Sequence, residues 1–110
     1  MIIKNVTNNI YVTSNAKEAV TVCDRLIGLL NPNNSRFLII KTHFGIHTIF
    51  MSNSIDVIVL DKGGLVVKLK ANLRPNQLFF YNPLHSTVIE MPSGSISKFS
   101  IHQNDKIYIG

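Results

Sequence analysis

The sequence predicts a mainly β protein, a small barrel or sandwich of about seven or eight short strands with one short helix near residues 22–30. Two observations support this fold class. Short runs rich in Val, Ile and aromatic residues recur along the chain, and Asn, Gly and Pro separate them. The expected strands cover residues 2–6, 10–12, 37–40, 55–60, 65–70, 78–81, 86–91 and 106–109.

The helix is predicted by apolar spacing and by its two ends. Apolar residues recur on one helical face between Val22 and Leu30, Thr21 is suited to cap the first turn, and Pro32 follows the last one. A single helical turn is expected at 96–99, and residues 14–18 read as a polar connection. The run 37–40 is expected to be a central strand that continues toward residue 44, with Gly45 at a bulge or bend.

Residues 55–70 predict a β-hairpin, because two β-branched runs flank the turn Asp61-Lys62-Gly63-Gly64. The expected register pairs Leu60 with Leu65, Ile58 with Val67 and Asp56 with Leu69. This register gives a core face of Ile58, Leu60, Leu65, Val67 and Leu69. The opposite face, expected to be half covered and half solvated, carries Ile55, Val57, Val59, Val66, Lys68 and Lys70.

Asp56 falls on the core side of this hairpin. A buried carboxylate needs hydrogen-bond donors or a cation, or else it takes up a proton. We favour an aspartate that accepts bonds from backbone N–H groups or from a nearby arginine over a catalytic one, because structural pairs are more common.

Composition limits the class of protein. A chain of 110 residues with 45% hydrophobic and 15% charged residues is expected to fold as one domain, residues 1–110. No apolar run is long enough to span a bilayer, and the first residues do not form a signal peptide. The single cysteine, Cys23, rules out an internal disulfide, so the cytoplasm is the expected compartment. The net charge of +5 is a weak indication of an anionic partner, because the basic residues are spread along the chain.

Several different short motifs follow one another along most of the chain. They are Ala19-x-Thr21-x-x-x-Arg25-x-x-Gly28-Leu29-Leu30, Ile46-His47-Thr48-x-x-Met51-x-x-x-Ile55-Asp56-x-x-x-Leu60-Asp61, Gly64-x-Val66, Leu73-x-Pro75, Ile89-Glu90-x-Pro92-x-Gly94 and Asn104-Asp105. In this order and spacing the chain resembles the bacterial and archaeal family called domain of unknown function 192, in the branch with an I-H-T-x-x-M-x-x-x-I-D signature. The resemblance covers residues 19–108. It implies a compact, mostly β domain and supplies no activity.

The chain departs from that branch at five positions. His43, Phe50, Ser52, Ser54 and Asn104 stand where the branch usually has Cys, Gly, Arg, Pro and Gly. Chemistry that depends on that Cys or Arg is therefore in doubt for this chain. If the family's arginine pairs with its aspartate, Asp56 needs another partner, either Arg25 or Arg74.

A metal site is the first chemical hypothesis. His43, His47 and Met51, with Cys23, His85 or His102 as further ligands, would suit copper or another soft metal. On a strand, however, His43 and His47 would stand about 13 Å apart, too far for one ion. We therefore expect no metal and no cofactor.

An enzyme is the second hypothesis. A hydrolase-like or thiol enzyme could use Cys23, in the first turn of a helix, with His47 as its base and with Thr48 and Asp56 nearby. The simpler interpretation is that Cys23 is a small buried apolar residue.

A nucleic-acid surface is the third hypothesis. Lys62, Lys68, Lys70 and Arg74 lie near Phe79, Phe80 and Tyr81 in the sequence, and small barrels do bind oligonucleotides through such residues. A solvated hairpin beside a core aromatic cluster explains the same pattern more simply. Nucleic acid is therefore disfavoured as the partner.

The remaining hypothesis is a polar cluster of Arg25, His47, Thr48, Met51, Asp56 and Glu90. It is either a structural hydrogen-bond network or the lining of a cleft for a small ligand, and the sequence does not separate these. We expect a small non-catalytic binding or accessory module with its site around the 46–56 segment. Its partner would be an unknown small ligand or a protein.

Overall fold

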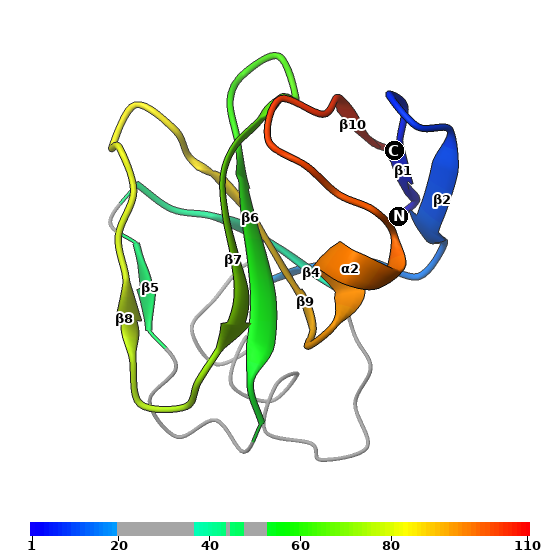
Figure 1. Cartoon of the computed structure of the whole chain (residues 1–110). Helices are drawn as coiled ribbons and strands as arrows, with labels where there is room; N and C mark the ends of the chain where they lie inside the picture. Colours follow the sequence, from blue (N-terminus) through cyan, green and yellow to red (C-terminus); the bar gives the residue numbers. More distant parts are fainter. Residues whose placement is uncertain (20–36, 44, 48–52) are drawn as a thin grey trace.

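The computed structural model describes residues 1–19, 37–43, 45–47 and 53–110. The predicted helix at 22–30 lies outside these residues, as do Cys23, Arg25, Thr48 and Met51. Within them the protein is mainly β, as predicted, and one short helix lies near the single helical turn expected at 96–99 (Figure 1). The elements are β1 (Ile3–Asn5), β2 (Ile10–Thr13), β3 (Lys17–Ala19), β4 (Leu38–Lys41), β5 (Ile46–His47), β6 (Ile55–Leu60), β7 (Val66–Leu73), β8 (Leu78–Phe79), β9 (Thr87–Pro92), α2 (Ser95–Lys98) and β10 (Ile107–Ile109).

The described strands form three sheets. A five-stranded sheet has the order β3-β4-β9-β6-β7, a three-stranded sheet the order β10-β1-β2, and β5 pairs with β8. In Figure 1 the β5–β8 pair and the three-stranded sheet lie on opposite sides of the five-stranded sheet. The chain is therefore layered, with the largest sheet in the middle.

Two apolar clusters hold the layers together. On one face of the central sheet, Ile58, Leu60 and Ile89 pack with Ile3 and Ile107 of the three-stranded sheet. On the other face, a second cluster joins the central sheet to the β5–β8 layer and contains Val57, Val59, Val88, Ile46 and Phe79. All six residues of β6 are consequently buried, because both faces of this strand are covered.

The hairpin of β6 and β7 forms, but the predicted register is wrong. Leu60 pairs with Val66 and Ile58 pairs with Leu69, and the ladder is interrupted between Val59 and Leu60. The Asp61 carboxylate accepts hydrogen bonds from the N–H groups of Gly63 and Leu65, both at 2.9 Å. These bonds hold Leu65 in the turn, so the ladder begins one residue later than expected.

The shifted register also corrects the predicted faces of the hairpin. Leu65 is 38% exposed, whereas Val66 is fully buried against the three-stranded sheet. Val67 packs on the opposite face, with the β5–β8 layer. The face expected to be half solvated is covered at Ile55, Val57 and Val59, while Lys68 and Lys70 are exposed as predicted.

Two further elements differ from the sequence prediction. Lys17 and Glu18, expected in a polar connection, form β3 together with Ala19, and this strand runs parallel to β4. The run at 37–40 has a strand on each side as expected, but β4 ends at Lys41. Gly45 has φ +86°, and a β-carbon there would lie 2.5 Å from the Phe79 carbonyl oxygen. Only glycine allows β5 and β8 to approach this closely.

Candidate functional site

Asp56 is buried and is held by the backbone. One carboxylate oxygen accepts from Asn72 N and the other from Ile96 N in α2, both at 2.8 Å. Asn72 has φ 56° and its side-chain oxygen accepts from the Ser93 hydroxyl at 3.1 Å. The favoured prediction, an aspartate bonded to backbone N–H groups, is confirmed, and Asp56 ties β7 to the start of α2.

Glu90 is fully buried and lies one residue from this site along the ladder. It pairs with Val57, whereas Asp56 pairs with Met91, so the two carboxylates face opposite sides of the central sheet. Glu90 shares its face with Val57, which packs in the cluster that contains Ile46 of β5. The backbone of His47 lies in β5, and its side chain is outside the described structure. A site combining these residues with Arg25, Thr48 and Met51 stays a prediction.

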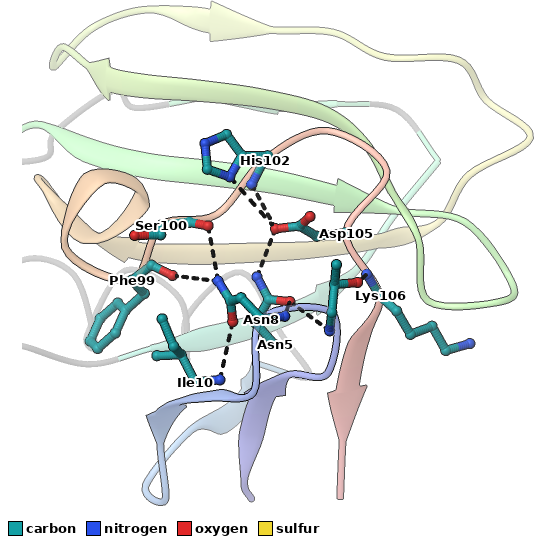
Figure 2. A network of polar contacts seen from close by, with 9 residues as sticks. Asn5, Asn8, Ile10, Phe99, Ser100, His102, Asp105 and Lys106 are labelled. Carbon is teal, nitrogen blue, oxygen red and sulfur yellow. Dashed lines mark hydrogen bonds and ion pairs between the residues drawn. The ribbon is translucent and has the colours of Figure 1, made fainter.

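A third buried carboxylate, Asp105, joins the two ends of the chain. Figure 2 shows the Asn5 side chain and His102 pointing toward it. Asp105 Oδ2 accepts from Asn5 Nδ2 at 2.8 Å and from His102 N at 2.9 Å, with His102 Nδ1 at 4.0 Å. Asn5 Oδ1 in turn accepts from Thr7 N at 3.1 Å. The closing Asn104-Asp105 motif therefore has a structural role, which the sequence alone did not assign.

The histidines of the described part have separate surroundings. His43 Nδ1 lies 2.6 Å from the Pro83 carbonyl oxygen, and His102 belongs to the Asp105 network. Within the residues that the structure describes, no three His, Cys, Asp or Glu side chains gather closely enough to hold a metal ion.

Some side chains of the predicted nucleic-acid surface contact other parts of the protein. The Lys68 ammonium group lies 4.9 Å from the Phe79 ring centre and donates to the Phe80 carbonyl at 2.5 Å. Phe79 is buried in the core, and the Tyr81 hydroxyl donates to the Thr42 carbonyl. Phe80 remains exposed, whereas Phe79 and Tyr81 help join the β8 region to the central sheet.

A groove lies between the end of the central sheet and β10, beside the β6–β7 turn. Its volume is about 360 Å³, and its lining includes Lys41, Lys62, Lys106, Thr87, Tyr108 and Asp61. We call it the lysine groove. Gly64, with φ +85°, shapes the turn here, because a β-carbon would lie 2.7 Å from the Ile107 carbonyl oxygen.

The lysines of this groove are exposed and only partly engaged. Lys41 Nζ donates to Thr87 Oγ1 at 2.9 Å, and Lys106 Nζ donates to the Gly63 carbonyl oxygen. Lys62 stands at the turn with an exposed side chain. An ammonium group has three donors, so Lys41 and Lys106 keep donor capacity for a ligand. Asp61 directs Oδ1 into its own turn through the two bonds to Gly63 and Leu65.

Sequence reasoning missed this groove. In the sequence Lys62 belongs to the predicted hairpin surface, and Lys41 and Lys106 belong to no predicted site. The three lysines come from β4, the β6–β7 turn and the residue before β10. Only the pairing of the turn with residues 104–107 brings them together. The glycine pair after Lys62 is a weak signal, since it marks a close backbone approach.

Among the residues that the structure describes, no helix has the length and apolar character needed to cross a membrane.

Comparisons with known proteins support the fold. A protein of unknown function from Novosphingobium aromaticivorans is similar, with TM-score 0.74 and 14% identity, over 98% of this chain and 82% of that one. A proposed transcription regulator from Sinorhizobium meliloti is similar with TM-score 0.73 and 11% identity, over 97% of this chain and 89% of that one. At these identities the likeness concerns the fold alone. No curated protein sequence matches the chain.

The family model that matches the sequence is the domain of unknown function 192, described as "Uncharacterized ACR", over residues 3–109. This match covers nearly the whole chain and includes residues 19–108, over which the resemblance was identified. The chain therefore belongs to the domain of unknown function 192 family.

Proposed function

We propose that the protein is a non-catalytic binding module whose ligand is anionic and docks in the lysine groove. The observation that carries the proposal is the meeting of Lys41, Lys62 and Lys106 around one hollow of about 360 Å³. A phosphate or carboxylate there would receive charge-assisted hydrogen bonds, which are shorter and stronger than neutral ones.

The physics of the groove favours a small or extended anion over a buried one. The lysines are exposed, so each contact is screened, and salt at physiological strength limits its range to about 8 Å. Attraction between single charges 4 Å apart near a protein surface is about 4 kcal/mol before desolvation is subtracted. Three such contacts support reversible binding that weakens as salt is added.

The test is a calorimetric titration with tripolyphosphate at low salt. We expect measurable binding by the wild-type protein and at least about ten-fold weaker binding by the triple variant Lys41→Gln, Lys62→Gln, Lys106→Gln, because a tenfold loss corresponds to about 1.4 kcal/mol. Glutamine is shorter than lysine but stays polar and can still donate hydrogen bonds, and it removes the charge. No binding by the wild-type protein at low salt would refute the proposal.

Lys70→Gln is the matched control for charge. Lys70 is exposed on β7 and belongs to the hairpin surface rather than to the groove. We expect the control to bind tripolyphosphate within about two-fold of the wild-type protein, a difference of roughly 0.4 kcal/mol. An equal loss in the control would mean that net charge, and not the groove, attracts the anion.

The segment 46–56 remains the second candidate surface of this module. Full burial of Glu90 on the sheet face that β5 covers supports it, because a buried carboxylate needs partners nearby. His47→Ala should leave tripolyphosphate binding unchanged if the lysine groove is the site. The thiol-enzyme alternative with Cys23 and His47 also stays a prediction.

The compartment we propose is the cytoplasm of a prokaryote. The bacterial and archaeal distribution of the resembled family and the presence of a single cysteine support this assignment.

A further inference from the structure

The outer face of the three-stranded sheet carries a row of two tyrosines with a lysine between them. In the register of this sheet Lys4 of β1 pairs with Tyr11 of β2 and with Tyr108 of β10. Cross-strand partners project from the same face, so the three side chains lie side by side. Tyr11 is 65% exposed and Tyr108 is 54% exposed. We call this set the tyrosine row.

The geometry of the row resembles what stacked bases require. Two strand spacings separate Tyr11 from Tyr108, which places their backbones about 10 Å apart. The Lys4 ammonium group lies 4.8 Å from the centre of the Tyr11 ring, and in the register Lys4 is the residue between Tyr11 and Tyr108. Exposed aromatic rings stack on bases of any sequence, and nearby cations attract the phosphate backbone.

The tyrosine row is continuous with the lysine groove. Tyr108 belongs to both, because it lines the groove together with its neighbour Lys106. A strand of nucleic acid lying across the row would therefore pass from Tyr11 over Lys4 to Tyr108 and reach Lys106, Lys62 and Lys41. The tyrosine row would then contact bases, and the lysine groove would contact phosphates.

Lysines outnumber acids in the lysine groove, whose lining holds Lys41, Lys62 and Lys106 and one acid, Asp61. Of the five acidic residues that the structure describes, three, Asp56, Glu90 and Asp105, are buried. Seven of the eight lysines are exposed, and Lys4 is half buried. The net charge of +5 is therefore displayed mainly by lysines at the surface, which favours polyanions.

We propose that the tyrosine row and the lysine groove together bind single-stranded nucleic acid. This inference rests on the anionic ligand proposed for the groove and names its class. It uses a different surface from the Lys68–Tyr81 region that the sequence indicated. The alternation of ring and cation favours nucleic acid over an acidic peptide, because carboxylates need the lysines alone and would leave both tyrosine rings exposed.

The experiment compares three ligands at low salt by calorimetry: an oligothymidylate of about ten nucleotides, an abasic strand of equal length, and tripolyphosphate. We expect the oligothymidylate to bind at least about ten-fold more tightly than the abasic strand, since stacking contributes only when bases are present. Its affinity should fall steeply as salt rises. The chain has three tyrosines and no tryptophan, so stacking should also quench tyrosine fluorescence.

Variants of the row separate stacking from charge. The double variant Tyr11→Ala, Tyr108→Ala should lose the preference for the oligothymidylate and keep its affinity for tripolyphosphate. The variant Tyr11→Phe, Tyr108→Phe should retain the preference, because phenylalanine also stacks. Tyr81→Phe is the control away from the row. Melting curves of all variants check that the fold persists.

Three outcomes would contradict this inference. If the protein binds tripolyphosphate but binds the abasic strand and the oligothymidylate with equal affinity, this inference is overturned. The proposal of an anion-binding module is then unaffected. No binding of any of the three ligands overturns both. Tighter binding of a poly-glutamate peptide than of the oligothymidylate assigns the surface to an acidic protein partner and overturns the inference as well.

Discussion

Charged side chains in the interior of the molecule and in the lysine groove differ in where their hydrogen-bond partners lie. Inside, Asp56 and Asp105 each accept two hydrogen bonds from groups of the chain itself. In the lysine groove, Lys41 and Lys106 each donate one hydrogen bond to the chain, and Lys62 is exposed. The buried charges have their partners within the fold, whereas the exposed charges keep donors for a partner from outside.

This difference separates two kinds of substitution. Removing a buried carboxylate leaves donors without water or partner, and the cost appears in the free energy of unfolding. Removing an exposed lysine changes stability little, because surface charges contribute at most about 1 kcal/mol. Its cost appears in ligand binding. Variants of both kinds test this separation.

Asp56→Ala should have the largest effect on stability. The substitution leaves the N–H groups of Asn72 and Ile96 without the carboxylate that accepts from them. We expect the free energy of unfolding to fall by about 3–5 kcal/mol, measured by urea denaturation at neutral pH.

Asp61→Ala is the matched comparison for this prediction. Asp61 also accepts from two backbone N–H groups, but it does so in an exposed turn where water replaces the lost bonds. We expect a loss of about 1 kcal/mol. Equal losses for the two variants would contradict the view that burial makes the interior carboxylate costly to remove.

Asn5→Ala should have an intermediate effect. The side chain is fully buried, donates to Asp105 and accepts from the N–H of Thr7, so its loss disturbs both strand β1 and the closing turn (Figure 2). We expect about 2–3 kcal/mol of destabilisation. Lys4→Ala, next to it on the outer face, should cost less than about 0.5 kcal/mol. The reverse order would contradict the assignment of the two faces of β1.

The sequence predicts most of the strands in the described part because their apolar runs are bounded by turn residues. It missed β3, whose residues Lys17 and Glu18 are exposed and polar, and whose parallel partner lies beyond a long connection. The hairpin register failed for another reason. The Asp61 carboxylate accepts a hydrogen bond from the N–H of Leu65 and so holds this residue in the turn. Pairing rules based on loop length do not include such a bond.

The candidate site was less predictable than the fold. Burial of Asp56 followed from its place in an apolar strand, but the donors that satisfy it are 16 and 40 residues away in sequence. The lysine groove and the tyrosine row depend on β10 closing against β1 and against the β6–β7 turn. Composition contains the charge and the aromatic residues, while only the topology brings them to one surface.

The smallest predicted effect concerns Tyr81, the tyrosine that belongs to the interior rather than to the row. Burial raises the pKa of its phenol above the ordinary value of 10.0 and outweighs a hydrogen bond from the Gly45 backbone that lowers it. In the unfolded chain the phenol ionises first, so the unfolded state binds fewer protons and stability falls as pH rises past about 10. Below that pH both states are protonated and the residue adds no pH dependence.

Tyr81→Phe should therefore remove part of the alkaline loss of stability, while Tyr11→Phe and Tyr108→Phe should leave that loss unchanged. Denaturation measured between about pH 9 and pH 11 gives the comparison. An absorbance titration of the phenolates provides an independent readout, in which Tyr81→Phe should eliminate the group with the raised pKa. If that group disappears instead in a variant of the row, Tyr11 or Tyr108 is the buried phenol, and the outer face of the three-stranded sheet is covered rather than open for stacking.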